Sequence, residues 1–223
     1  MQPRAVQDTA TVSSLDLEAF ARTPLARDPF DHLIVPEFLR AEACEALGGA
    51  FPAITRGGSF AADSLPHDPV FAAFLDELRG PEITRAMAAK FGIDLSGRPV
   101  MVTLRGQSRA KDGRIHADSK SKLVTALIYM NPGWREAGGR LRLLRGSGDI
   151  EDYAAEVPPE RGTLIAFRCA PNAYHGHKPF VGARRSIQVN WMTDEAVMTR
   201  ELARHGLSAW TKKLLFRFGG TAN

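Results

Sequence analysis

The sequence is poor in cysteine and contains no long hydrophobic run. Its only two cysteines, Cys44 and Cys169, are too few and too far apart for a disulfide scaffold or a cysteine metal site. No apolar stretch approaches the roughly 18 to 20 residues that a transmembrane helix needs. The N-terminal residues also lack the apolar core of a signal peptide. We therefore expect no membrane insertion and a reducing, cytoplasmic setting.

Internal repeats, low-complexity tracts and a strong charge excess are also absent. The 29 basic and 25 acidic residues leave a net charge of +4, too small by itself to indicate a nucleic-acid binder. No RNA-recognition or helix-turn-helix signature is present, so we expect no nucleic-acid partner. The 223 residues are 44% hydrophobic and suit a single domain over 1–223, with residues 1–12 loose.

Two halves of the chain differ in their hydrophobic pattern. Before Gly97, the spacing of apolar residues predicts a strand at 32–35 and a loop at 56–69. The helices expected there cover about 13–20, 41–47, 69–78 and 81–91.

The region of about 99–192 is rich in short β-type runs separated by Gly, Pro and Asn. The strands expected are 99–104, 114–118, 122–130, 139–144, 162–168, 173–177 and 184–192. Helical patterning returns from Asp194 to Phe218. We interpret the chain as α+β with a mainly β core, an antiparallel barrel or jelly roll wrapped by N-terminal and C-terminal helices.

One group of residues in the β-rich half carries chemistry. His116 and Asp118 share one face if they lie on a strand, and His175 and Arg184 follow later in the chain. Two imidazoles and one carboxylate can occupy one face of an octahedral metal, as in non-haem Fe(II) oxygenases. The open positions then allow a bidentate organic acid and dioxygen to bind. The guanidinium of Arg184 can hold a distal carboxylate bidentately.

Other residues compete for these roles. His177 points the same way as His175 on a strand, and Arg185 neighbours Arg184 but alternates to the opposite face. The remaining histidines lie outside the motif series: His32, His67 and His205.

The order of motifs in this half resembles a known family. The series comprises His116-x-Asp118, Leu127-Ile128-Tyr129-Met130-Asn131, Gly138-Gly139-Arg140-Leu141-Arg142-Leu143, Pro158, Gly162-Thr163-Leu164-Ile165-Ala166-Phe167, His175-Gly176-x-x-Pro179-Phe180 and Gly182-x-Arg184-x-Ser186-Ile187. It resembles the Fe(II)/2-oxoglutarate-dependent dioxygenases, in particular the prolyl-4-hydroxylase-like bacterial branch. We prefer His175 to His177 as the second histidine ligand, because the spacing from His175 to Pro179 and to Arg184 fits the pattern of this family.

The resemblance implies a double-stranded β-helix (jelly roll) with Fe(II) held by His116, Asp118 and His175. It also implies 2-oxoglutarate and dioxygen as cosubstrates, with the distal carboxylate of 2-oxoglutarate on Arg184. Tyr129 takes the position from which family members donate a hydrogen bond to the same carboxylate.

Strand alternation adds residues to this pocket. Ser186 and Gln188 share the face of Arg184, so we expect them to help line the pocket.

The implied activity is hydroxylation of a small substrate with release of succinate and CO2. Asp118 favours hydroxylation, because halogenating relatives replace that carboxylate with a small residue. The substrate is not readable from the loops at 59–69, 106–114 and 146–152.

Local charge bears on the substrate class. Between Met101 and Lys122 there are six basic and two acidic residues, which accounts for the whole excess of +4. Such a window fits a doubly negative cosubstrate and is compatible with an anionic substrate.

Three alternatives remain at this level. One is a cupin-like metalloenzyme that does not use 2-oxoglutarate, and another is a protein or peptidyl hydroxylase. The third is a basic binding module built on a C-terminal helix with Trp210, Leu214, Leu215 and Phe218 on one side and Lys212, Lys213 and Arg217 among its polar residues. That helix is expected to pack on the barrel or on a second subunit, which is compatible with a homodimer.

Overall fold

The structure, a computed structural model, describes residues 13–203. The loose segment expected at 1–12, His205 and the apolar helix expected around Trp210 to Phe218 lie outside the described residues. No helix in the part of the chain that the structure describes is both long enough and apolar enough to cross a membrane.

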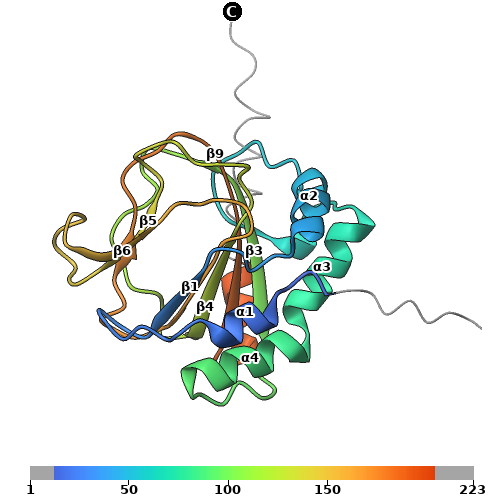
Figure 1. Cartoon of the computed structure of the whole chain (residues 1–223), viewed down its shortest axis with the longest axis horizontal. Coiled ribbons are helices and arrows are strands. Elements are labelled where there is room, and N and C mark those ends of the chain that lie inside the picture. Colours follow the sequence, from blue (N-terminus) through green and yellow to red (C-terminus); the bar gives the residue numbers. More distant parts are fainter. Residues whose placement is uncertain (1–12, 204–223) are drawn as a thin grey trace, which may run out of the picture.

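Two antiparallel sheets form the core (Figure 1). The six-stranded sheet has the order β1-β7-β4-β9-β3-β2, and the three-stranded sheet has the order β6-β5-β8. The strands are β1 (His32–Val35), β2 (Phe60–Ala61), β3 (Val100–Ser108), β4 (Lys122–Tyr129), β5 (Leu141–Leu144), β6 (Tyr153–Val157), β7 (Leu164–Arg168), β8 (His175–Gly176) and β9 (Gly182–Met192). A cluster that includes Phe167 of the large sheet and Leu143 of the small one packs between them, so the sheets are the two layers of a sandwich.

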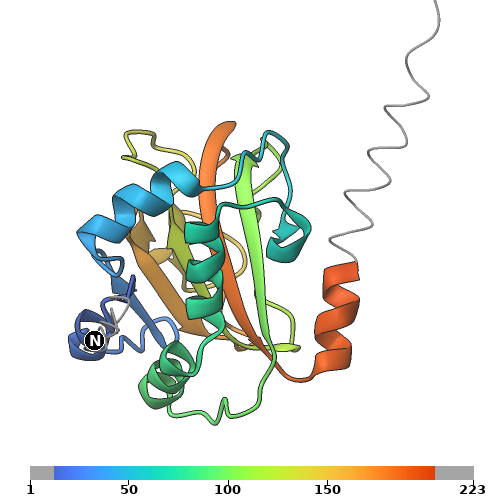
Figure 2. The same ribbon diagram turned by 90° about the vertical axis from the view of Figure 1, so that its right-hand side faces the viewer.

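Helices cover the outer face of the six-stranded sheet (Figure 2). They are α1 (Leu17–Arg22), α2 (Ala41–Ala50), α3 (Pro69–Arg79) and α4 (Pro81–Phe91). The residues that recur at helical spacing are buried, which confirms the amphipathic faces predicted for α3 and α4: Phe71, Phe74, Leu75 and Leu78 in α3, and Ile83, Met87 and Phe91 in α4. This packing leaves the opposite face of the sheet for the site.

Helix predictions differ from the structure at two ends. The second helix continues through Gly48 and Gly49 to Ala50 and ends because Phe51, which precedes Pro52, is extended. The first helix begins at Leu17 rather than near residue 13, because the Asp16 carboxylate caps it by accepting a hydrogen bond from the Ala19 amide. A helix over 195–203 follows Asp194, as predicted for that part of the tail.

Strand predictions also need correction in three places. The strand expected at 114–118 is only an isolated bridge at His116. Strand β6 was not predicted, because most of it is half-exposed and carries few β-branched residues. The loop expected at 56–69 contains β2 and a short 3-10 helix, η1 (Ala62–Ser64).

Candidate metal centre

His116 and His175 are held opposite each other by two backbone hydrogen bonds. The His116 amide donates to the His175 carbonyl at 3.0 Å, and the His175 amide donates to the His116 carbonyl at 2.9 Å. Residues paired in this way project their side chains to the same face. Their ring centroids lie 4.3 Å apart. A single antiparallel bridge therefore brings two distant histidines together.

Each of these imidazoles is oriented by a backbone carbonyl. The Nδ1 atom of His116 lies 2.9 Å from the carbonyl oxygen of Arg114, and that of His175 lies 3.0 Å from the carbonyl oxygen of Ala173. A carbonyl oxygen only accepts, so Nδ1 is the donor in both rings and Nε2 is the atom left to bind a metal. Burial lowers the pKa of His175 to about 4, and His116 adds to this shift, so the His175 ring is neutral near pH 7.

Asp118 is fixed by two neighbours. Thr125 Oγ1 donates to one carboxylate oxygen at 2.6 Å, and Lys122 Nζ donates to the other at 2.8 Å. Burial raises the pKa of Asp118, but the Lys122 ammonium outweighs it together with smaller contributions, and the net pKa lies below its usual value. The carboxylate is therefore ionised near pH 7.

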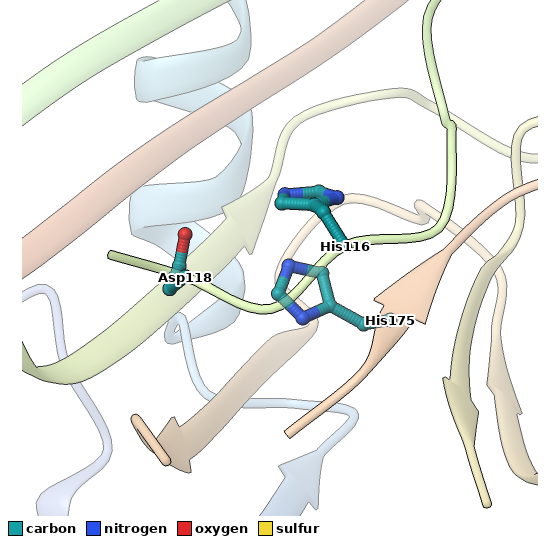
Figure 3. A group of neighbouring side chains, drawn as sticks. All are labelled: His116, Asp118 and His175. Atoms are coloured by element: carbon teal, nitrogen blue, oxygen red, sulfur yellow. The ribbon is translucent and has the colours of Figure 1, made fainter. Parts of the chain in front are cut away.

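The three side chains converge from the bridge and the loop beyond it (Figure 3). One potential ligand atom from each of His116, Asp118 and His175 lies within 4.8 Å of the other two. Two imidazole nitrogens and one ionised carboxylate are a donor set that suits a divalent first-row metal such as Fe(II). The residues present fit such an ion, with all three donors on one side of it.

His177 does not join this group. Its Nδ1 lies 2.8 Å from the carbonyl oxygen of Lys178, and its amide donates to the Gly113 carbonyl at 2.9 Å. Burial lowers the pKa of His177 to about 4, with Arg184 adding to the shift. Of the two histidines considered from sequence, the structure thus places His175 beside His116 and His177 toward Arg184.

Arg184 and Tyr129 form a second polar cluster on the same face of the sheet. Arg184 is buried and donates from Nε to the Gly139 carbonyl at 2.7 Å, and its guanidinium carbon lies 5.3 Å from the Tyr129 ring centroid. No carboxylate among residues 13–203 pairs with Arg184. The Tyr129 hydroxyl is buried and makes no hydrogen bond of normal geometry in the described chain. Burial raises its pKa, and the adjacent Arg184 opposes this shift. A buried cation and an unused hydroxyl donor together suit an anionic ligand.

The pairing of β9 with β3 and β4 shows which side of the sheet Ser186, Arg105 and Arg185 face. Ser186 lies directly between Tyr129 on β4 and Arg105 on β3, so these three residues face the same side. Arg185 lies on the opposite face, with its guanidinium carbon 5.7 Å from the ring centroid of Phe51. The predicted alternation of β9 therefore holds in the structure.

A cavity of about 270 Å³ opens beside His116 and Asp118. Thr103 and Arg105 of β3, Gln188 and Asn190 of β9, and Glu201 of helix 195–203 also line it, as do Ser59, Met101, Ala117, Ser119 and Lys122. Sequence reasoning missed three contributors: Thr125 and Lys122, which hold Asp118, and Arg105 in the cavity. The position of Arg105 depends on cross-strand register, which cannot be read along one strand alone. Lys122 and Thr125 lie four and seven residues after Asp118, and their contacts depend on the turn between them.

Comparison with known proteins agrees with this geometry. Residues 106–193 match the model of the 2OG-Fe(II) oxygenase superfamily. No curated protein matches the chain.

Several solved structures are similar to this chain. A viral collagen prolyl hydroxylase from Paramecium bursaria Chlorella virus-1 is 16% identical, with 74% of this chain and 96% of that chain covered and a TM-score of 0.52. A 2OG-Fe(II) oxygenase family oxidoreductase from Burkholderia pseudomallei is 15% identical, with 80% and 90% covered and a TM-score of 0.51. A Pseudomonas putida prolyl-4-hydroxylase is 18% identical, with 80% and 93% covered and a TM-score of 0.48.

These comparisons confirm the predicted jelly-roll fold, a double-stranded β-helix with helices packed around it. The family uses Fe(II), 2-oxoglutarate and dioxygen, and the cluster of two histidines and one aspartate fits the metal. Residues 106–193, which hold all three candidate metal ligands, match the 2OG-Fe(II) oxygenase superfamily, and this match supports a 2-oxoglutarate-dependent dioxygenase.

Proposed function

We propose that the enzyme hydroxylates a small-molecule substrate and converts 2-oxoglutarate to succinate and CO2. In this proposal His116, Asp118 and His175 hold Fe(II), and Arg184 and Tyr129 hold the distal carboxylate of 2-oxoglutarate. Ser186 lines the same pocket. When bound at this site, Fe(II) supplies the activation of dioxygen, of which one atom enters succinate and the other enters the hydroxylated product.

One observation carries the proposal more than the others. Among residues 13–203, the Arg184 guanidinium has no counter-ion and the Tyr129 hydroxyl makes no hydrogen bond of normal geometry. The two groups lie next to each other, buried on the sheet face that also carries Thr125, which binds Asp118. Buried polar groups that serve only the stability of a fold nearly always have hydrogen-bond partners. A dicarboxylate with one end on the metal and the other on Arg184 would satisfy both groups.

The residues of this chain have separable tasks. The carbonyl contacts of the two histidines keep Nε2 available to a metal, and Thr125 fixes the Asp118 carboxylate. Arg184 and Tyr129 orient the cosubstrate, and the apolar cluster around Tyr129 limits water in the pocket.

The alternatives gain no support from the comparisons. A cupin-like enzyme without 2-oxoglutarate does not account for the family match over 106–193. The viral structure is a collagen prolyl hydroxylase, but an identity of 16% carries no substrate to this chain. No observation on residues 13–203 favours a basic binding module.

The test is formation of succinate from 2-oxoglutarate with Fe(II), ascorbate and a panel of small molecules. We expect 2-oxoglutarate turnover in the wild type and none above background in Asp118→Ala. The matched control is Asp76→Ala, which removes an exposed carboxylate on α3 and should leave turnover unchanged. Unchanged succinate release in Asp118→Ala would overturn the proposal.

A further inference from the structure

Arg105 projects from β3 into the cavity that also contains His116 and Asp118. It lies opposite Ser186 in the register of β3 and β9, on the same sheet face as Tyr129 and Arg184. It is half-buried. Its position is therefore next to the proposed reaction centre but on a different strand from the residues assigned to 2-oxoglutarate.

The other basic residues near the site are engaged or point elsewhere. Arg109 forms an ion pair with Asp112 at 2.9 Å, and Lys122 forms one with Asp118 at 2.8 Å. Lys111 lines a separate hollow. Arg105, in contrast, has no hydrogen-bond or ion-pair partner among the residues that the structure describes. Among the six basic residues between Met101 and Lys122, Arg105 is therefore the one that faces the cavity without an ion pair to any described residue.

The surroundings of Arg105 disfavour its charge. Burial lowers the pKa of Arg105, and the nearby Arg184 and Arg109 add to this shift, while Asp112 opposes it. Arginine stays protonated even so, and a partly buried cation without a counter-ion is costly to keep. An anionic ligand would remove this cost.

Charge and position indicate which ligand that is. In the proposed function, one end of 2-oxoglutarate binds the metal and the other binds Arg184, so neither carboxylate needs Arg105. Arg105 carries a single positive charge, which one carboxylate neutralises. Thr103 and Gln188 supply neutral polar groups on the same wall.

We propose that Arg105 binds the carboxylate of the primary substrate, which is therefore a small monocarboxylic acid held in the cavity between β3 and the metal site. This inference rests on the proposed function. Arginine suits the task because its guanidinium binds a carboxylate bidentately. The hydroxylated carbon then lies on the part of the acid that faces His116 and Asp118.

The experiment is isothermal titration in three steps, with Mn(II) as a redox-inert metal. The first step measures 2-oxoglutarate binding to the wild type, Arg105→Gln and the control Lys111→Gln, which removes an exposed charge outside the cavity. The second titrates a series of monocarboxylates from acetate to benzoate, each beside its amide, into the Mn(II)–2-oxoglutarate complex. The third titrates inorganic phosphate.

We expect all three proteins to bind 2-oxoglutarate equally. At least one acid should bind the wild type and Lys111→Gln in preference to its amide, and Arg105→Gln should weaken that acid by at least about tenfold. Phosphate should bind less tightly than the acid.

Four results would overturn the inference: binding of no acid, equal binding of acid and amide, tighter binding of phosphate, or retained acid affinity in Arg105→Gln. Loss of 2-oxoglutarate affinity in Arg105→Gln would also do so, because Arg105 would then belong to the cosubstrate. Failure of the wild type to bind 2-oxoglutarate with Mn(II) marks failure of the proposed function instead. The acids are then titrated into the metal-free protein, so the role of Arg105 is still decided.

Discussion

Successive residues of β9 serve two very different faces of the six-stranded sheet. Ile187, Val189 and Trp191 face outward into the apolar cluster under the helices. The Trp191 indole N–H donates to Thr84 Oγ1 at 3.1 Å, so even the polar atom of that side chain has a partner. The outer face is thus apolar and closely packed, and the polar indole nitrogen of Trp191 has a hydrogen-bond partner.

The inner face of the same strand has the opposite character. Arg184, Ser186 and Asn190 are buried there, yet Arg184 lacks a counter-ion within the described chain. The Asn190 Nδ2 atom and the Tyr129 hydroxyl have no hydrogen-bond partner among residues 13–203. Buried polar groups without partners are rare where structure alone is at stake. The contrast indicates that one face stabilises the fold and the other is built for ligands.

The largest effect should come from the neighbouring pair Arg184 and Arg185. Arg184→Gln should weaken 2-oxoglutarate binding by about 30-fold or more, because a buried carboxylate would lose its charged partner. Arg185→Gln removes the same charge from the opposite face and should leave the affinity unchanged. Titration of 2-oxoglutarate with Mn(II) measures both, and equal losses would break the distinction between the faces.

For stability, we expect the outward-facing Ile187 to matter more than the inward-facing Ser186. Ile187→Ala should lower the free energy of unfolding by about 2–5 kcal/mol, because it leaves a cavity in the packed outer face. Ser186→Ala should change it by less than about 1 kcal/mol. Urea unfolding of the metal-free proteins tests this pair. Similar losses in both variants would mean that the inner face also carries the stability of the fold.

Acid should destabilise the protein through its buried inner histidines. The pKa of His177 and of His175 is about 4 in the folded protein, against about 6.5 unfolded, so the unfolded state takes up more protons between these values. Stability is therefore full above pH 6.5 and falls as the pH drops toward 4, by about 2 kcal/mol per histidine at pH 5.

His177→Gln should remove one of these two contributions. The metal-free variant should lose about 2 kcal/mol less than the wild type between pH 7.5 and pH 5 in urea unfolding. An identical loss in the two proteins would show that His177 is not held neutral by its surroundings.

The smallest effect separates two threonines on the inner face. Thr125→Val deletes the hydroxyl that donates to Asp118, and should weaken Mn(II) binding by about tenfold. Thr103→Val changes a buried threonine on β3 that makes no contact with Asp118, and metal affinity should stay unchanged. Calorimetric titration of Mn(II) measures both variants. A loss in Thr103→Val as large as that in Thr125→Val would remove the special role of Thr125.

Much of this layout was predictable, because period-two alternation is a local property. It placed Arg184, Ser186 and Gln188 on one face and Arg185 on the other. The apolar spacing in α3 and α4 likewise predicted which sides of these helices are buried.

Cross-strand partners were not predictable from local pattern. Arg105 faces the cavity because of how β3 pairs with β9, and that register shifts between Arg105 and Gln107. A shift of one residue moves side chains to the other face, so alternation within β3 could not settle where Arg105 points. The hydrogen bond from Thr125 to Asp118 was also not predictable, because it depends on how close the loop that carries Asp118 lies to β4. The strand expected at 114–118 was wrong because only His116 pairs there, although that one bridge sufficed to join the two histidines.

The central claim is that His116, Asp118 and His175 hold one divalent metal ion. Its most direct test is Mn(II) titration of the wild type, His175→Ala and His177→Ala, since these two histidines lie two residues apart and both are buried. We predict one Mn(II) per chain in the wild type and in His177→Ala, and affinity reduced by more than about 100-fold in His175→Ala. Unchanged binding in His175→Ala, or loss in His177→Ala alone, would contradict the account.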